Sequence, residues 1–356
     1  MTQSRDVKAC YTFQEPVSLG RARKTVLEGI QTETLKLQYF SHEYGEVPIL
    51  FGYLSVRSQD AAEAAINSIL AMFEEEKAAL LTERTDGPAG PRTYLHSKYS
   101  HLLKQACCCC WKFQMDPSNP LIKQVLTFDV LLSDENTISR LIRVISDKTN
   151  GYNLGLVSRW FLRQLQKKFK YLVKVAANTC FSNRVQLINQ LESPSGFNGY
   201  RFSYLHLASF CTHPKLIALL LRHGADPDRG SPRFGRRWPV GYLFHAMCWD
   251  VYKGRDDCAC RVRRCLQIYC RAMPRIPLQI PSFHDPSDSE PDLLAVQRAR
   301  WNSWVPRDRC TDPCELKHLC RCLIRKRLQD NGALPGGVYQ LNLPTLLQKY
   351  LDLLLD

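Results

Sequence analysis

The sequence predicts an all-α fold, and three observations support this prediction. Apolar residues recur at helical spacing through most of the chain, and 45% of its 356 residues are hydrophobic. Strand-like alternation of apolar and polar residues is scarce after about residue 94. Short runs of Asn, Asp, Gly and Pro separate the helical segments, as expected of connections between packed helices. A chain of this length can bury a substantial core in one or two domains.

The N-terminal third is assigned to a divergent, mostly helical region over 1–130. It contains extended-looking segments such as EVPILFGYLSV at 46–56 and one strong helix at 60–83, with Asp60 as its N-cap. The stretch at 85–92, TDGPAGPR, breaks the helical pattern and predicts a surface loop. Shorter helices are then predicted over 94–106, 119–132, 134–147 and 154–173.

The most informative stretch is GYRFSYLHLASFCTHPKLIALLLRHGADPD at 199–228. Ala208 is small enough for two helices to approach closely, the leucines at 219–221 bury the second helix, and Gly224 supplies the positive φ that ends it. With these roles, the stretch resembles one ankyrin repeat, in which Ser203-Tyr204 replaces the usual Thr-Pro. The residues that match the ankyrin signature are Leu205, His206, Ala208, Gly224, Ala225 and Asp226.

One such repeat cannot bury its apolar face alone, so about three or more should stack. One period upstream, Ala176 precedes Ala208 by 32 residues, which suggests an equivalent unit over 172–193. Downstream, 238–273 fits as a third, lengthened unit. The resemblance therefore implies an irregular ankyrin-repeat solenoid, with degenerate repeats over 131–273 and its best repeat at 199–228.

Pro, Ser and Asp dominate the following stretch, so residues 274–299 are interpreted as an extended linker. A compact segment is expected over 300–356. It contains CELKHLCRCLIRKRL at 314–328, in which three cysteines and a histidine invite a metal hypothesis.

Helical geometry argues against a metal site in this stretch. At 100° per residue, Cys314, His318 and Cys322 share one stripe, whereas Cys320 falls on the other side of the helix. A structural zinc site needs four convergent ligands, and arginines adjoin the stripe. We therefore predict no metal site and no cofactor.

The other side of this helix is continuously apolar and must pack against something. Cys320 lies in its middle, as a small side chain suited to a tight pocket. The spacing of Leu316, Cys320 and Ile324 resembles the elongin-binding box of SOCS-box proteins. The residues of the apolar face are Leu316, Leu319, Cys320, Leu323 and Ile324.

The last residues extend this resemblance. Leu341-Asn342-Leu343-Pro344 stands where the family carries a Leu-Pro-Leu-Pro cullin box, with Asn342 in place of the first proline, and LLQKYL resembles the closing helix. The whole arrangement resembles the ankyrin repeat and SOCS box family, so a three-helix SOCS box is expected at the C-terminus.

That resemblance implies a non-catalytic substrate-recognition subunit of an elongin B/C–cullin-5 RING ubiquitin ligase. The apolar face would bind elongin C with elongin B alongside, and Leu341, Leu343 and Pro344 would contact cullin-5, which carries its RING partner. The ankyrin surface would select an unknown protein substrate. Its candidate contacts are Tyr200, Arg201, Phe202, Arg233, Phe234, Arg236, Arg237 and Trp238, because Arg and aromatic side chains dominate binding hot spots. Each of them could instead simply cover a neighbouring helix.

Two alternatives stay open. A non-catalytic ankyrin scaffold would use its SOCS box for stability alone, and a basic nucleic-acid-binding protein would use the net charge of +14. Solvated helix faces explain most of the basic runs more simply, so nucleic acid is the less favoured partner. No phosphate-binding Gly loop, HExxH or GxSxG motif occurs, and no enzyme is predicted.

The cysteines and the chain's N-terminus bear on its compartment. The N-terminus lacks an apolar signal core and no stretch reaches about 20 apolar residues, so we expect a cytoplasmic protein, with the nucleus as a second compartment and no membrane partner. The 16 cysteines are expected as free thiols. The cluster Cys107–Cys110 could be palmitoylated, but buried or surface thiols are favoured because stable anchoring needs a second signal. Residues 258–270 are expected to form a core helix.

Overall fold

The computed structural model shows a row of packed α-helices capped by a small helical unit. No β-strand occurs among the residues that the structure describes, apart from one isolated bridge between Cys180 and Gln186. The all-α prediction is confirmed for this part of the chain. The described residues are 58–82, 91–132, 136–149, 159–180, 185–190, 202–230, 238–252, 258–277 and 291–355.

The helices begin and end near the residues that the sequence predicts. The strong helix expected at 60–83 is α2, Gln59–Thr82, and the segment EVPILFGYLSV lies outside the described residues. The remaining repeat-region helices are α3 Pro91–Lys112, α4 Pro120–Leu132, α5 Thr137–Thr149, α6 Arg159–Ala177, the 3₁₀ helix η3 Leu187–Asn189, α7 Tyr204–Phe210, α8 Pro214–Arg222, α9 Pro239–Tyr252, α10 Cys258–Ala272 and α11 Pro291–Trp304.

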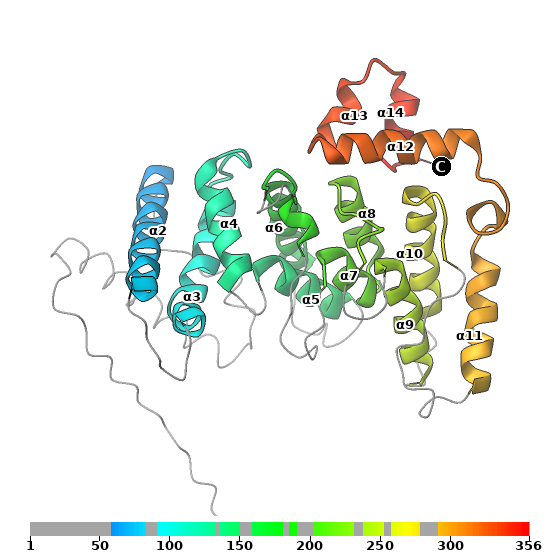
Figure 1. The fold of residues 1–356 in the computed structure, drawn as a ribbon, viewed down its shortest axis with the longest axis horizontal. Helices are drawn as coiled ribbons and strands as arrows, with labels where there is room; N and C mark the ends of the chain where they lie inside the picture. The colour runs from blue at the N-terminus through cyan, green and yellow to red at the C-terminus, as the bar shows by residue number, and fades with distance from the viewer. Residues whose placement is uncertain are drawn as a thin grey trace, which may run out of the picture.

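These helices form two rows that run along the long axis of the molecule (Figure 1). Helices α5, α7 and α9 contact one another in sequence along one row, while α4 contacts α6 and α8 contacts α10 along the other. Helix pairs α3–α4, α5–α6, α7–α8 and α9–α10 connect the rows. This is the irregular ankyrin-type solenoid that the sequence predicts.

The best repeat has the local chemistry expected of it. The Ser203 backbone N–H donates to His206 Nδ1 at 3.1 Å, so Ser203 and His206 close the start of α7 in place of the usual Thr-Pro. His213 caps α8 by accepting the Leu216 N–H. Gly224 follows α8 with φ of 89°, which only glycine adopts at little cost.

The predicted equivalence of Ala176 and Ala208 is wrong. Ala176 lies in α6, in the same row as α8, whereas Ala208 lies in α7, in the opposite row. The α5–α6 pair is therefore the unit that precedes α7–α8. Between α6 and α7, the described residues contain one further helical segment, η3, so the 32-residue spacing joins helices with different places in the repeat.

The short helix η3 is nevertheless tied to the best repeat. The Asn189 side chain donates to the Gly224 carbonyl at 3.0 Å and accepts the Asp226 N–H at 2.7 Å. These bonds satisfy backbone groups at the turn that follows α8, where a helix leaves its last carbonyls without partners. Ile188 is fully buried beside them, so η3 still contributes to the core.

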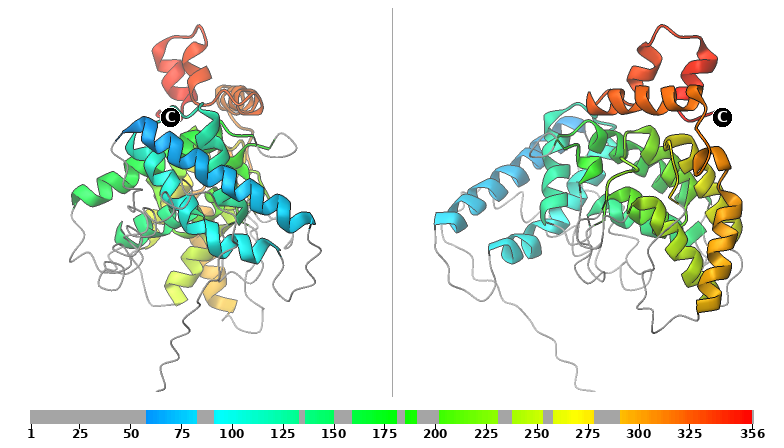
Figure 2. Two further views of the ribbon diagram at one scale, coloured as in Figure 1. Left: turned by 90° about the vertical axis from the view of Figure 1, so that its left-hand side faces the viewer. Right: turned by 45° about the vertical axis from the view of Figure 1, so that its right-hand side comes forward.

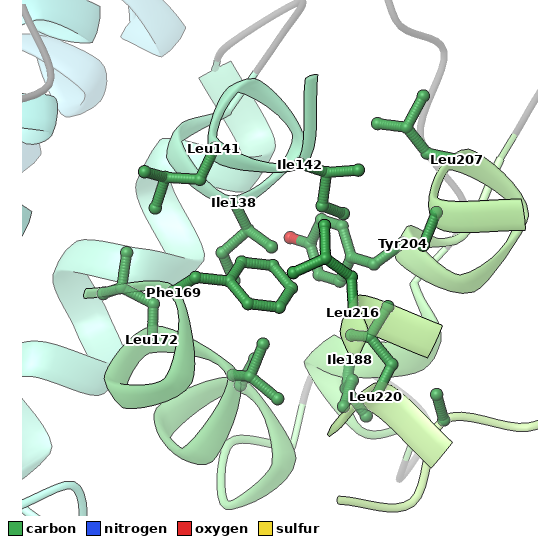
Figure 3. Packing of buried hydrophobic residues seen from close by; sticks show 14 of the residues in the cluster. Ile138, Leu141, Ile142, Phe169, Leu172, Ile188, Tyr204, Leu207, Leu216 and Leu220 are labelled. Atoms are coloured by element: carbon green, nitrogen blue, oxygen red, sulfur yellow. The ribbon is translucent and has the colours of Figure 1, made fainter. Parts of the chain in front are cut away.

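The core is continuous from α2 to α11. Its central part brings together α5, α6 and α8, where Ile142, Phe169 and Leu216 point toward one another (Figure 3). Each such fully buried side chain contributes about 1.5–3 kcal/mol relative to an exposed one. The core also contains Cys265 and Leu266 of α10, which confirms the core helix predicted at 258–270.

The four cysteines Cys107–Cys110 lie at the end of α3 and are all buried. Burial raises the pKa of the Cys107 thiol, so it stays protonated. The structure thus shows buried thiols, one of the two states that the sequence favoured over palmitoylation. Among the described helices, none is long and apolar enough to cross a membrane.

The linker predicted over 274–299 is wrong in its second half. Residues 291–304 form α11, which packs against α9. The physical reason is Trp301, which is fully buried and meets the Phe244 ring edge-on at 5.6 Å between centroids. The first residues of the expected C-terminal unit at 300–356 thus belong to the end of the repeat stack.

Candidate functional site in the C-terminal helical box

Three helices form a compact box after the repeat stack: α12 Leu316–Asp330, α13 Gly336–Gln340 and α14 Thr345–Leu351. Helix α12 lies across the ends of the repeat helices, and α13 and α14 stand above it (Figure 2). Leu334, Val338 and Leu351 form the small core of the box. A Cβ at Gly337 would come within 2.8 Å of the Ala333 Cβ, so glycine is needed where α13 turns back against α12.

The apolar face that the sequence predicts on α12 is exposed. Leu316 is 76% exposed, Leu323 is 62% exposed and Leu319 is 42% exposed. Cys320 is also exposed and lies among them. Single exposed apolar side chains are ordinary, whereas several on one helix face point to a binding surface.

Other predicted contact residues point into the box. Ile324, Leu341 and Leu343 are half-buried against its core, beside Leu328. We therefore assign them a supporting role in holding the box together. Pro344 and Asn342 are exposed, so the cullin-type segment presents the proline rather than its two leucines.

The opposite face of α12 is polar and buried. His318 is fully buried, and Arg321 and Arg325 are 2% and 7% exposed. This face packs on the ends of α8 and α10. Burying a guanidinium is costly unless its donors are hydrogen-bonded, so its partners decide whether the contact is stable.

Arg325 joins the box to the repeat stack. One terminal nitrogen donates to the Leu221 carbonyl at 2.6 Å and the other to the Leu351 carbonyl at 2.7 Å. Leu221 lies in the last turn of α8, where carbonyls lack helical partners and the helix dipole favours a cation. Desolvation lowers the pKa of Arg325 to about 10, so it remains charged at neutral pH.

A second buried link is centred on Asp352. Its carboxylate accepts two hydrogen bonds from Arg222 of α8, at 2.5 and 3.1 Å, and one from the Tyr339 hydroxyl at 2.6 Å. Asp352 is fully buried, and the bidentate geometry is the strong form of this ion pair. Together with Gln329, which donates to the Gly224 carbonyl, these bonds fix the box on the stack.

The stripe that suggested metal ligands forms part of the same junction. His318 donates from Nε2 to the Met273 carbonyl at 2.8 Å and accepts at Nδ1 from Arg321 at 2.9 Å, so it works as a neutral ring. The Cys314 thiol donates to the Pro274 carbonyl. Across the part of the chain that the structure describes, no group of three or more His, Cys, Asp or Glu side chains could hold a metal ion.

Two of the substrate-contact candidates, Phe202 and Trp238, lie among the described residues. Trp238 is 36% exposed at the start of α9, and it remains a candidate. Phe202 is buried and meets the Tyr242 ring at 5.1 Å, so it covers a neighbouring helix and cannot be a surface contact. The other candidates lie outside the described residues: Tyr200, Arg201, Arg233, Phe234, Arg236 and Arg237.

Sequence reasoning missed a second exposed apolar group in the box. Leu346, Leu347 and Leu354 are 69%, 38% and 46% exposed on α14 and the turn after it. Tyr350 and Leu351 from the same helix are buried. The leucine-rich sequence TLLQKYLDLLL hides this division, because every position of α14 except Thr345, Gln348 and Lys349 is apolar or aromatic and looks suited to a core.

Comparison with protein families identifies the box. The SOCS box family model matches residues 312–352, which include α12, α13 and α14. The C-terminal part of the chain, at 312–352, is a SOCS box. Curated proteins with similar sequences include ankyrin repeat and SOCS box proteins. The name of these relatives pairs ankyrin repeats with a SOCS box, and the structure of this chain likewise combines a helical repeat stack with a C-terminal box.

The curated relatives match only a short part of this protein. Ankyrin repeat and SOCS box protein 17 from Canis lupus familiaris is 49% identical over 55 residues, which is 15% of this chain and 19% of the relative. The protein of that name from Homo sapiens is 47% identical over the same length. The chain thus covers about a fifth of the length of the relatives it matches. No solved structure matches the chain.

Proposed function

We propose that this protein is a substrate receptor of an elongin B/C–cullin-5 RING ubiquitin ligase. The observation that supports this most strongly is the exposed apolar row Leu316, Leu319, Cys320 and Leu323 on the first helix of a SOCS box. Covering such a row by a partner removes apolar area from water, at about 25 cal/mol per Å². Elongin C is the proposed partner at this row, with elongin B bound to elongin C.

The repeat stack would hold the target protein, and the box would hold the ligase. The protein would do no chemistry itself; it would raise the effective concentration of target near the ubiquitin-loaded enzyme. This division needs a fixed geometry between the two parts. The buried bonds of Arg325 and Asp352 supply it, because they connect α8 of the stack directly to the box.

The decisive experiment places charges on the exposed row. Leu316→Asp with Cys320→Asp should reduce capture of elongins B and C by at least about 100-fold, because a carboxylate buried in an apolar interface is left unpaired. Thermal stability should hardly change, since both side chains are exposed in the free protein. The matched control is Val296→Asp, which charges another exposed apolar position, 58% exposed on α11.

Two results would decide against the proposal. Equal capture of elongins by the doubly substituted and parent proteins would show that the row is not the binding surface. Normal elongin binding without cullin-5 recruitment would instead favour the non-catalytic scaffold. The variant Pro344→Asp separates elongin binding from cullin-5 recruitment. It should weaken cullin-5 recruitment about tenfold and leave elongin capture unchanged, because Pro344 is exposed outside the apolar row.

A further inference from the structure

A basic groove lies on the repeat stack between α6 and the connection from α3 to α4. Its volume is about 550 Å³, within the range of ligand-binding clefts. Lys167, Lys170 and Lys174 project from one face of α6 along one wall. Trp111 and Met115 line the other wall, and His223 at the end of α8 completes the groove.

The three lysines give this wall of the groove a concentrated positive charge. All three are exposed, and among the described residues no hydrogen bond or ion pair is formed by their ammonium groups. Asp116, in the connection beside the groove, interacts electrostatically with Lys174, but its carboxylate already accepts hydrogen bonds from the Ser118 N–H and hydroxyl. The groove therefore attracts anions.

The groove is also held open by its own contacts. The Tyr171 hydroxyl, from the lysine-bearing helix, donates to the Met115 carbonyl at 2.7 Å, and this bond is buried. It fixes the connection from α3 to α4 against α6. Binding to such a preformed site costs less ordering of the chain than binding to a loose surface.

His223 gives an independent sign of an incomplete site. It is 7% exposed and lines the groove, and its buried Nδ1 atom has no hydrogen-bond partner. A buried polar atom without a partner is rare in folded proteins and costs free energy. A ligand bound in the groove can form a hydrogen bond with this Nδ1 atom. A row of lysines that only faces solvent would not explain why the atom is buried without a partner.

We infer that this groove binds an acidic peptide segment of a partner protein. Lys167 and Lys174 are separated by seven residues of α6, or about 10 Å along the helix. An extended peptide covers that distance in about three to four residues. A run of about four acidic residues next to one apolar residue therefore matches the lysine row and the Trp111 wall.

The assignment of this acidic segment to the ubiquitination target rests on the proposed function. Peptide binding itself does not rest on it. The groove lies on α3, α6 and α8, whereas the elongin-type row lies on α12. The two surfaces can therefore be disabled separately.

The test measures fluorescence anisotropy of the full chain with a labelled 12-residue peptide that contains four Glu and a Leu between Gly and Ser residues. A peptide with Gln in place of each Glu is the matched probe. The groove variant is Lys167→Gln, Lys170→Gln and Lys174→Gln. The control removes the same charge from exposed positions on α8 and α10, by Lys215→Gln, Arg263→Gln and Arg264→Gln.

The acidic peptide should bind at least tenfold more weakly to the groove variant, and less than twofold more weakly to the control. Equal loss in both variants, or binding of the Gln peptide as tight as that of the Glu peptide, would overturn the inference. So would a 12-nucleotide RNA that binds through the same lysines while the acidic peptide does not. Measuring elongin capture by the same samples separates peptide binding by the groove from the proposed ligase function. Lysine-dependent peptide binding without elongin capture would support the groove as a peptide site and contradict the proposed function.

Discussion

The two faces of α12 reverse the usual distribution of side chains. Leu316, Leu319 and Leu323 face solvent, while His318 and Arg325 on the other side are buried. In a helix that only stabilised its own fold, the leucines would be inside. The difference teaches that the two faces of α12 have separate roles: the polar face is hydrogen-bonded within this chain, and the apolar face is exposed, as the proposed binding of elongin C requires.

The largest loss of stability is expected from a substitution of Arg325 on the buried face of α12. Arg325→Met keeps much of the side-chain volume but leaves the Leu221 and Leu351 carbonyls without their buried donor. We expect the free energy of unfolding to fall by about 3 kcal/mol, in the range found when a buried polar network loses one partner. Urea unfolding followed by circular dichroism gives this value.

The matched change on the other face is Leu323→Gln. Because Leu323 is 62% exposed, the free energy of unfolding should change by less than about 0.5 kcal/mol. If Leu323→Gln destabilised the chain as much as Arg325→Met, the two faces would not differ as described.

The next effect concerns Asp352. Asp352→Asn keeps the shape but removes the charge that binds Arg222, and we expect a loss of about 2 kcal/mol, since Arg222 is partly exposed. A double-mutant cycle with Arg222→Met isolates the pair. A coupling free energy near zero would show that the link between α8 and the box lies elsewhere.

A smaller effect should appear with pH, and only on the buried face. Desolvation, followed by the nearby Arg309 and Arg321, lowers the pKa of His318 below its usual value near 6.5. The unfolded chain therefore binds a proton more readily, so the stability that neutral His318 contributes is present above pH 6.5 and is lost as the pH falls below it. His318 must also stay neutral to accept from Arg321.

His318→Gln tests this directly, because an amide can donate and accept but does not titrate. We expect the melting temperature of the parent protein to fall more steeply between pH 7 and pH 5 than that of the variant. Other buried histidines add to the fall in both proteins, since burial lowers the pKa of His213 to about 4. Identical slopes for parent and variant would mean that His318 is not acid-sensitive.

The exposed face of α12 was predictable from the sequence, and the buried one was not. Helical spacing alone places Leu316, Leu319 and Leu323 on one side, away from Cys314 and His318. It does not show that Arg325 meets a carbonyl of α8, because Leu221 lies 104 residues earlier and only the packing of the whole stack brings them together. A polar helix face that carries arginines is ordinarily expected to lie in solvent.

The repeat stack shows the same limit. The signature of α7 and α8 depends on local geometry at Ser203, His206 and Gly224, and these roles were predictable. The pairing of α5 with α6 depends on which helices meet in the folded stack. The matching spacing of Ala176 and Ala208 does not reveal this, and it therefore assigned Ala176 to the wrong row. The basic groove also escaped prediction, because Lys167 and Lys174 gain meaning only from Trp111 and His223 on other helices.

The smallest expected effect lies at the rim of the junction. Lys326 is half-exposed and lies 3.9 Å from Asp226 and 3.3 Å from Asp330. Exposed ion pairs contribute about 0–1 kcal/mol, because solvent screens them and the side chains lose freedom. Lys326→Ala should therefore change the free energy of unfolding by less than about 0.5 kcal/mol, measured by the same urea titration.

This small value matters for the comparison, because Lys326 and Arg325 are neighbours on one helix with the same formal charge. If the box were held on the stack by long-range attraction between basic α12 and acidic Asp226, the two substitutions would cost similar amounts and both costs would shrink in 0.5 M salt. Buried, directional hydrogen bonds predict a large cost at Arg325 that salt hardly alters. A large, salt-sensitive loss in Lys326→Ala would contradict that account and make surface charge the force that docks the box.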